Sequence, residues 1–323
     1  MLNLDVSMGL VRVTEAAALK SARLIGRGDK IAADQAAVDG MGKAFEFMPI
    51  KGTVVIGEGE LDEAPMLYIG QKVGMWEDYM PEMDIAVDPV EGTILIAKGL
   101  SDAIAVVAMG PKGSLLHAPD MYMKKIAVGS KAKGAIDINK SPKENMINVA
   151  KALNKDIREL TVITQDRDRH QNIIDDAREL GARVKVFSEG DVTAVLACGF
   201  ENTGIDLFMG IGGAPEGVIA AAGIKCLGGE MQAQLVPHTD EEIKRCASMG
   251  INDVSKIFTI DDLVKNEDVY FAATGITDCP FLEGVAFSKD NIATSHSIVM
   301  RSKTGTIRFI EAIHDLNKSI IME

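Results

Sequence analysis

The sequence has few cysteines, few aromatic residues and no excess of basic residues. It carries 47 acidic side chains against 34 lysines and arginines, a net charge of -13. Binding to a nucleic-acid backbone requires clustered basic side chains, so this charge argues against nucleic acid as a partner. Only 5% of the residues are aromatic, which predicts a core of aliphatic side chains and of the 17 methionines.

The cysteines and the hydrophobic runs predict neither disulfide bonds nor membrane-spanning segments. Cys198, Cys226, Cys246 and Cys279 form no CxxC pair and have no histidine at metal-ligand spacing, so we expect reduced thiols. No apolar run approaches the roughly 20 residues that span a bilayer, and the first residues do not resemble a signal peptide. We therefore expect a cytoplasmic protein without a membrane partner.

Several catalytic motifs are also missing. There is no GxSxG nucleophile motif and no phosphate-binding P-loop, and the GIGG run at residues 210–213 lacks the last glycine of a dinucleotide-binding loop. The five histidines are scattered, with none paired at helical spacing, and the simplest interpretation is that they are surface or supporting residues. His170 alone adjoins a candidate contact.

The periodicity predicts a mixed α/β protein. Helices are expected over residues 7–26, 30–47, 145–152, 171–180, 218–222 and 240–249, and strands over 52–57, 103–109, 160–164, 181–187, 205–209, 270–274, 294–301 and 306–310. Strands and helices alternate from about residue 160, which predicts parallel pairing in a second lobe. A length of 323 residues is compatible with one or two lobes.

The segment at residues 83–99, MDIAVDPVEGTILIAKG, organises our interpretation. A buried strand is expected at residues 85–87 and is expected to stop at Pro89, which has no backbone donor. Asp88 would then lie at the carboxyl end of that strand, with Glu91 three residues further on. Gly92 allows close approach of a ligand, and Thr93 would open a short helical turn whose free amides attract an anion. Carboxylates for a cation and amides for a phosphate therefore fall side by side.

Other polar clusters follow predicted strands. Glu58, Glu60, Asp62 and Glu63 come directly after the strand at residues 52–57, and they form either a solvated turn or a metal-facing edge. The runs QDRDRH at residues 165–170 and SEGD at residues 188–191 follow two later strands, where ligands bind in open α/β sheets. The glycine-rich run GGAPEG at residues 212–217 is either a structural turn or a loop that brings Glu216 to a site.

The run DPVEGT at residues 88–93 resembles the DPxDGT/S element of the metal-dependent sugar phosphatases that include inositol monophosphatase. A glutamate in place of the second aspartate, the string VIGEGELDEAPMLY at residues 55–68 and the GGAPEG run are more similar still to the class II bacterial fructose-1,6-bisphosphatases. The resemblance extends over residues 7–308.

This resemblance implies a layered α/β/α/β/α sugar-phosphatase fold of the α/β (α+β) class, like that of inositol monophosphatase, with two lobes at residues 1–158 and 159–323. It implies hydrolysis of the 1-phosphate of fructose 1,6-bisphosphate to fructose 6-phosphate, a step of gluconeogenesis. The implied partners are a sugar bisphosphate and a second copy of the chain, in a dimer or tetramer. The implied cofactor is Mn²⁺ or Mg²⁺, hard ions that select carboxylate oxygens.

The resemblance also implies roles for individual residues. Most of the metal ligands would lie in the first lobe, and the second lobe would hold the sugar-phosphate contacts and Glu216. The implied metal ligands are Asp34, Glu58, Asp88, Glu91 and Glu216. The implied catalytic residues are Thr93, which orients a water, and Asp62 and Glu60, which polarise Thr93. The implied substrate contacts are Lys30, Glu91, Gly92, Thr93, Tyr122, Arg167, Asp168, Arg169, Glu189, Gly190, Asp191 and Gly213.

Two positions depart from the family pattern. Asp168 replaces a proline and adds negative charge next to a phosphate contact, which bears on affinity or on the preferred substrate. Ile94 replaces a polar residue.

Two other functions remain as alternatives to fructose 1,6-bisphosphate hydrolysis. One is a related phosphatase acting on sedoheptulose 1,7-bisphosphate or on an inositol phosphate, and the other is a sugar-phosphate sensor without catalysis.

Overall fold

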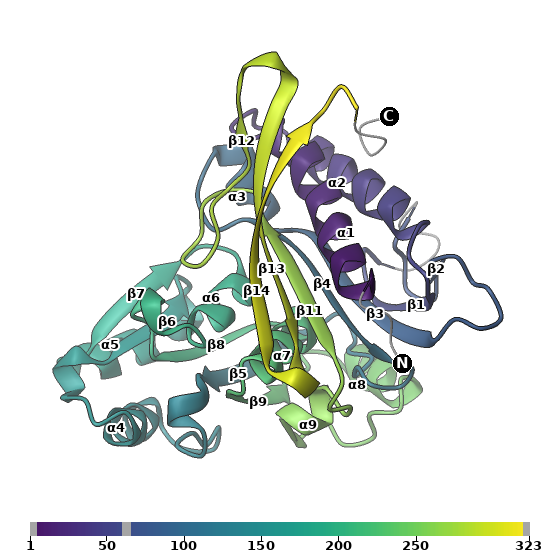
Figure 1. Cartoon of the computed structure of the whole chain (residues 1–323). Coiled ribbons are helices and arrows are strands. Elements are labelled where there is room, and N and C mark those ends of the chain that lie inside the picture. The colour runs from purple at the N-terminus through teal and green to yellow at the C-terminus, as the bar shows by residue number, and fades with distance from the viewer. Residues whose placement is uncertain (1–4, 60–65, 319–323) are drawn as a thin grey trace. The chain divides into compact units, whose positions relative to one another are not determined.

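The computed structural model describes residues 5–59 and 66–318 (Figure 1). The chain divides into two compact units, unit 1 with Met1–Leu115 and Asn266–Glu323, and unit 2 with Leu116–Lys265. This division differs from the lobe border expected at residues 158 and 159. The last strands pair with the first sheet, and such long-range pairing leaves no local signal in the sequence.

Unit 1 is built from helices and strands of both ends of the chain. Its elements are α1 (Asp5–Ala22), α2 (Lys30–Phe45), β1 (Lys51–Ile56), β2 (Lys72–Val73), β3 (Glu82–Glu91), α3 (Thr93–Lys98), β4 (Ile104–Pro111), β11 (Tyr270–Gly275), β12 (Ala286–Phe287), β13 (Ile292–Arg301) and β14 (Thr306–Asp315), with 3₁₀ turns at Lys289–Asn291 and Ser302–Thr304. The strand order of its sheet is β12-β13-β11-β4-β3-β1-β2, and β14 pairs with β13.

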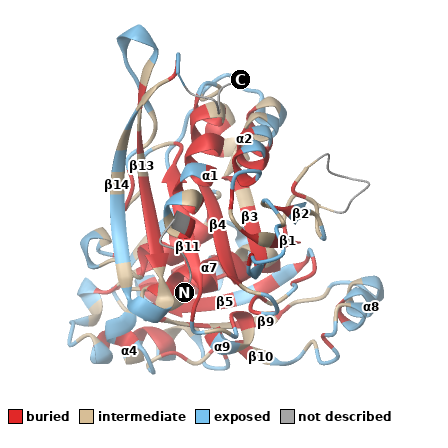
Figure 2. Cartoon of the chain, turned by 45° about the vertical axis from the view of Figure 1, so that its right-hand side comes forward, coloured by how far each residue is buried: buried red, intermediate tan, exposed pale blue. Residues whose placement is uncertain are grey.

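The helices α1 and α2 pack against each other and against this sheet (Figure 2). The alanines of α1 at positions 16 to 18 are fully buried, and α2 turns Gly40 towards the backbone of Ala16. A Cβ at Gly40 would lie 2.5 Å from the Ala16 carbonyl oxygen, so the glycine allows the two helices to approach closely. The core therefore uses small aliphatic side chains, as the scarcity of aromatic residues predicts.

Unit 2 contains the alternating strands and helices that the sequence predicts. Its elements are β5 (Tyr122–Val128), α4 (Pro142–Ala152), β6 (Thr161–Gln165), α5 (Gln171–Glu179), β7 (Arg183–Phe187), α6 (Asp191–Ala197), β8 (Leu207–Gly213), α7 (Ala214–Cys226), β9 (Glu230–Leu235), α8 (Asp240–Ser248), β10 (Ile257–Thr259) and α9 (Ile260–Leu263), with 3₁₀ turns at Ser130–Ala132, Ile157–Glu159, Asp168–His170 and Glu201–Thr203. The strand order is β10-β9-β5-β8-β6-β7.

The sheet of unit 2 is mixed. Strand β6 is parallel to β7 and β8, which confirms the predicted parallel pairing, whereas β5 is antiparallel to β8 and β9. One face of β5 packs with α4 through Ile126 and Val128, and Lys125 on the other face lies beside Gly217 of α7. The α/β class with two mixed sheets is confirmed. The four cysteines are free thiols, as expected.

Strand β3 corrects one expectation. It does not stop at Pro89 but continues to Glu91. Its ladder with β4 pairs Asp88 with Val106 and next Glu91 with Ile104, so a bulge lies between them. Pro89 lies in this bulge, where its missing N–H costs no ladder hydrogen bond.

Among the described residues, no helix has the length and apolar character that crossing a membrane requires.

Candidate active site

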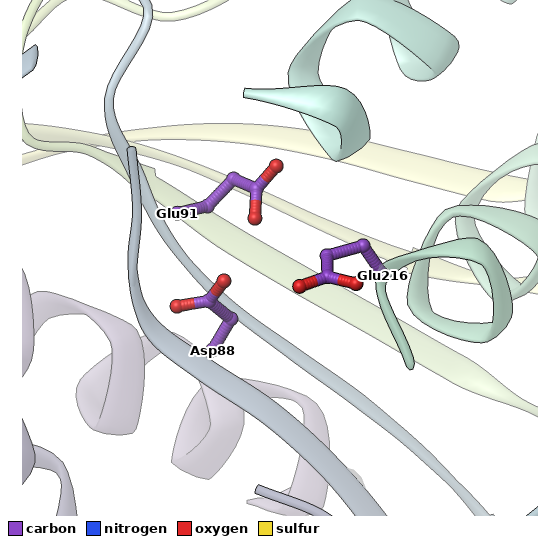
Figure 3. Close-up of side chains that lie close together, drawn as sticks. All are labelled: Asp88, Glu91 and Glu216. Atoms are coloured by element: carbon purple, nitrogen blue, oxygen red, sulfur yellow. The ribbon is translucent and has the colours of Figure 1, made fainter. Parts of the chain in front are cut away.

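The bulge of β3 brings two predicted metal ligands together. Asp88 and Glu91 each present a carboxylate oxygen, and these oxygens lie within 4.8 Å of each other (Figure 3). The Val90 N–H donates to Asp88 Oδ1 at 3.0 Å, which fixes the aspartate inside the bulge. Asp88 is half-buried and Glu91 is only 5% exposed. Two carboxylates so close in a water-poor position favour a cation between them.

A tight turn follows the pair. Gly92 has φ 96° and ψ 54°, the left-handed conformation that glycine adopts without strain, and a Cβ there would lie 2.7 Å from Leu95 Cδ1. Thr93 is then the first residue of α3, as predicted. The turn therefore places the Thr93 hydroxyl two residues from Glu91, next to the acidic pair in sequence and at the same end of β3.

A second acidic pair belongs to the same unit. Asp34 lies in α2, and Glu58 follows β1, which is parallel to β3 and pairs its Ile56 with Ala86. Burial, together with the smaller effect of the Asp34 carboxylate, raises the pKa of Glu58 to about 7. Burial also raises the pKa of Asp34. Glu58 and Asp88 thus follow paired residues of neighbouring parallel strands, at one edge of the sheet.

In unit 2, Glu216 lies in the first turn of α7, which begins directly after β8. A Cβ on Gly213 would collide with the Glu216 carboxylate, so the glycine makes room for that side chain above the strand end. The GGAPEG run is therefore not a loop but the junction of β8 and α7, and the role of Glu216 as a metal ligand stays a prediction.

A buried ion pair lies beside this loop. Lys125 of β5, only 1% exposed, donates from Nζ to Asp191 Oδ2 and, at 2.9 Å, to the Gly213 carbonyl. Asp191 is the first residue of α6 and follows Gly190, which has φ 96°. A Cβ on Gly212 would collide with the Asp191 carboxylate. Lys125 thus connects two predicted substrate contacts, Asp191 and Gly213.

The predicted phosphate contacts lie at the carboxyl end of β6. Arg167 donates from Nη2 to the Ser188 carbonyl at 3.2 Å, and the Arg169 guanidinium lies 5.0 Å from the centroid of the Tyr122 ring. Arg169 and Tyr122 are exposed. Asp168, in the 3₁₀ turn that directly precedes α5, is also exposed. Glu189 lies in the following loop and is half-buried. The structure therefore brings Arg169 and Tyr122 together on one surface of unit 2.

Four further residues named in the sequence analysis remain to be located. Glu60 and Asp62 lie outside the described residues, so their catalytic roles stay predictions. Lys30 is the exposed first residue of α2, preceded by Asp29, which accepts a hydrogen bond from the Ala32 N–H at 3.0 Å. Ile94 is half-buried in α3.

Sequence reasoning missed the buried Lys125, and it noted His170 only as the histidine next to a candidate contact. His170 is fully buried and hydrogen-bonds through both ring nitrogens. Lys125 reads in sequence as one of two adjacent lysines of a strand, and only the strand alternation distinguishes it from exposed Lys124. That alternation is the one signal that marks Lys125 as inward-facing.

Oxygen donors alone, burial that raises carboxylate pKa values, and a threonine beside the acidic strand end fit a hard divalent cation. Together with two mixed α/β sheets, this set of groups is typical of metal-dependent phosphatases.

Comparison with known proteins places the chain more closely. The family of bacterial fructose-1,6-bisphosphatases, glpX-encoded, matches residues 4–314, and the chain belongs to this family. Relatives named D-fructose 1,6-bisphosphatase class 2/sedoheptulose 1,7-bisphosphatase occur in Synechocystis sp. and Synechococcus elongatus. Each is 43% identical to this chain over 96% of its length, and the match spans 97% and 96% of the respective relative.

Proposed function

We propose that this protein hydrolyses the 1-phosphate of fructose 1,6-bisphosphate, releasing fructose 6-phosphate and inorganic phosphate. The observation that carries the proposal is the Asp88 and Glu91 carboxylate pair in the β3 bulge, followed by Gly92 and the Thr93 hydroxyl, in a chain that belongs to the glpX-encoded family. A reaction on a phosphate monoester needs charge neutralisation and a directed water, and this segment offers groups for both.

We further propose that the cofactor is Mg²⁺ or Mn²⁺, with Asp34, Glu58, Asp88, Glu91 and Glu216 as its ligands, a set that the resemblance to the family implies and that the closeness of the Asp88 and Glu91 carboxylates supports. A bound divalent ion neutralises charge on the phosphoryl oxygens and lowers the pKa of a water. Raised carboxylate pKa values support the assignment, since they indicate buried acids that a cation would stabilise in their charged form.

The remaining residues would orient the attacking water and bind the substrate. Thr93 holds the attacking water in line, with Glu60 and Asp62 as proposed proton acceptors. The phosphate that is not cleaved is held by Arg167, Arg169 and Tyr122. Asp168 adds a negative charge that repels this phosphate. Lys30 adds a positive charge that attracts the substrate. Glu189, Gly190, Asp191 and Gly213 bind sugar hydroxyls. We also propose that the chain forms a homo-oligomer, a dimer or a tetramer, which sedimentation of the purified protein tests.

The second candidate substrate is sedoheptulose 1,7-bisphosphate. The names of the Synechocystis and Synechococcus relatives include this activity, which is the specific reason to test it. Both substrates carry a phosphate at each end of a ketose, so the same carboxylates and arginines would serve either. Specificity then depends on the extra carbon between the two phosphates.

The deciding experiment is a phosphate-release assay on both bisphosphates with Mn²⁺, with Mg²⁺ and with a chelator. We expect release from fructose 1,6-bisphosphate that stops on chelation and returns with added metal. An inositol monophosphate serves as the control substrate. Binding of the sugar bisphosphates in calorimetry without any phosphate release would instead identify a sensor.

A further inference from the structure

The carboxyl ends of β6 and β8 separate in unit 2. These parallel strands pair only where Val162 faces Leu207 and Ile163 faces Phe208 in the part of the chain that the structure describes. Beyond that point β6 ends at Gln165, while β8 continues to Gly213 beside β5. Parallel strands that diverge at their carboxyl ends open the crevice in which α/β proteins bind ligands.

The imidazole of His170 spans this gap. Its Nε2 lies 2.8 Å from the Ile211 nitrogen of β8, and its Nδ1 lies 2.9 Å from the Gln165 carbonyl oxygen of β6. The Ile211 N–H can only donate, so Nε2 is the acceptor. Nδ1 therefore carries the proton and donates to Gln165. The neutral ring replaces the ladder hydrogen bonds that the two strands lack here.

Arg169 is held on the same two residues. Its Nε and Nη2 donate to the Ile211 carbonyl at 3.1 and 2.8 Å, and Nη2 also donates to Gln165 Oε1 at 2.7 Å. Three of the five guanidinium N–H groups are thereby directed at protein oxygens, which fixes the plane of the group. The spacing between Gln165 and Ile211 sets that plane, and His170 sets the spacing.

We propose that His170 is a positioning residue for Arg169. By holding Gln165 and Ile211 at a fixed separation, it presents the Nη1 edge of the Arg169 guanidinium towards the phosphate that is not cleaved. The inference rests on the proposed function, in which Arg169 contacts that phosphate. His170 itself touches no substrate.

The consequence is a defined kinetic pattern. Contact with the phosphate that does not react stabilises the bound substrate and the transition state alike, so its loss raises KM and leaves kcat little changed. Replacing His170 by Leu removes both hydrogen bonds, and we expect KM for fructose 1,6-bisphosphate to rise roughly tenfold with kcat altered less than about threefold. His170→Gln offers a planar group with an acceptor and a donor, and should restore KM to within about threefold of the wild type.

A double-mutant cycle tests whether His170 acts through Arg169. Arg169→Met should raise KM at least as much as His170→Leu, and the pair of substitutions should raise it no further than Arg169→Met alone. All four proteins are assayed as metal-loaded enzyme, with circular dichroism to check folding. If His170→Leu does not fold, His170→Asn takes its place, because its shorter side chain reaches only one of the two backbone groups.

Binding of fructose 6-phosphate, followed by calorimetry, separates this inference from the proposed function. This ligand carries only the uncleaved phosphate and needs no turnover. Weaker binding by His170→Leu and recovery in His170→Gln support the inference even if the wild type releases no phosphate. Equal affinity in wild type and His170→Leu, or KM effects that add fully to those of Arg169→Met, would overturn it while leaving the hydrolase assignment intact.

Discussion

Lys125 and Asp191 form a nearly dry ion pair in unit 2, in which the lysine side chain is fully buried and the aspartate side chain is 12% exposed. The lysine also donates to the Gly213 carbonyl, so one ammonium connects β5, the start of α6 and the end of β8. A charge this deep in a protein is tolerated only with a partner. The pair therefore holds the proposed sugar contacts in place.

Lys125→Met is expected to destabilise the protein by about 3–5 kcal/mol, because Asp191 is left as an uncompensated buried charge. The double variant Lys125→Met/Asp191→Asn should recover part of this loss, since no charge then remains. Urea unfolding measures both. Lys112→Met serves as the control, because the Lys112–Glu82 pair is exposed to solvent and should contribute little to stability. Equal losses in the two single variants would contradict the role of burial.

Asp88→Asn is expected to abolish metal-dependent phosphate release while the fold persists. Metal that binds only the folded protein raises its stability, by about 2.7 kcal/mol at a hundredfold excess over Kd. The wild type should therefore melt at a higher temperature with Mn²⁺ than with a chelator, and Asp88→Asn should lose this difference. Glu82→Gln, at the exposed start of the same strand, should keep it.

The extent to which sequence reveals this site depends on how local each contact is. One short segment contains Asp88, Glu91, Gly92 and Thr93, and α3 begins at Thr93 as this segment predicts. The continuation of β3 through Pro89 could not be predicted from the segment, because the bulge is defined only by pairing with the partner strand β4.

The contacts of His170 and Lys125 could not be predicted from the sequence either. Their hydrogen-bond partners Ile211 and Asp191 lie 41 and 66 positions away in the chain. Nothing in a window of neighbouring residues indicates such pairing. The unit border escaped prediction for a related reason, since β11, β13 and β14 join a sheet that begins more than half the chain earlier.

Gly213→Ala is expected to weaken Mn²⁺ binding, because the new Cβ collides with the Glu216 carboxylate and forces it from its place. Gly210→Ala in the same strand is the matched control, since a Cβ there meets its nearest atom, Phe208 Cζ, at an ordinary 3.4 Å. Titration calorimetry with Mn²⁺ should give a roughly tenfold or greater loss for Gly213→Ala. Similar affinities for the two variants would remove Glu216 from the ligand set.

Glu15 of α1 makes stability depend on pH. Burial raises its pKa to about 7, against the lowering effects of the Ser295 hydrogen bond and of Arg12. His314 Nε2 lies 3.9 Å away, and burial lowers the pKa of this histidine. Below about pH 4.5 Glu15 is protonated in both folded and unfolded chains and costs nothing. As the pH rises towards 7 only the unfolded chain loses the proton, so the folded state is progressively disfavoured.

Glu15→Gln removes this ionisation and keeps the shape of the side chain. The variant should therefore gain stability over the wild type as the pH rises from 5 to 8, by up to about 3 kcal/mol at the upper end. Thermal melts at three pH values measure the difference, with exposed Glu77→Gln as the control. A gain that is the same at every pH would mean that packing, rather than the buried charge, distinguishes the two proteins.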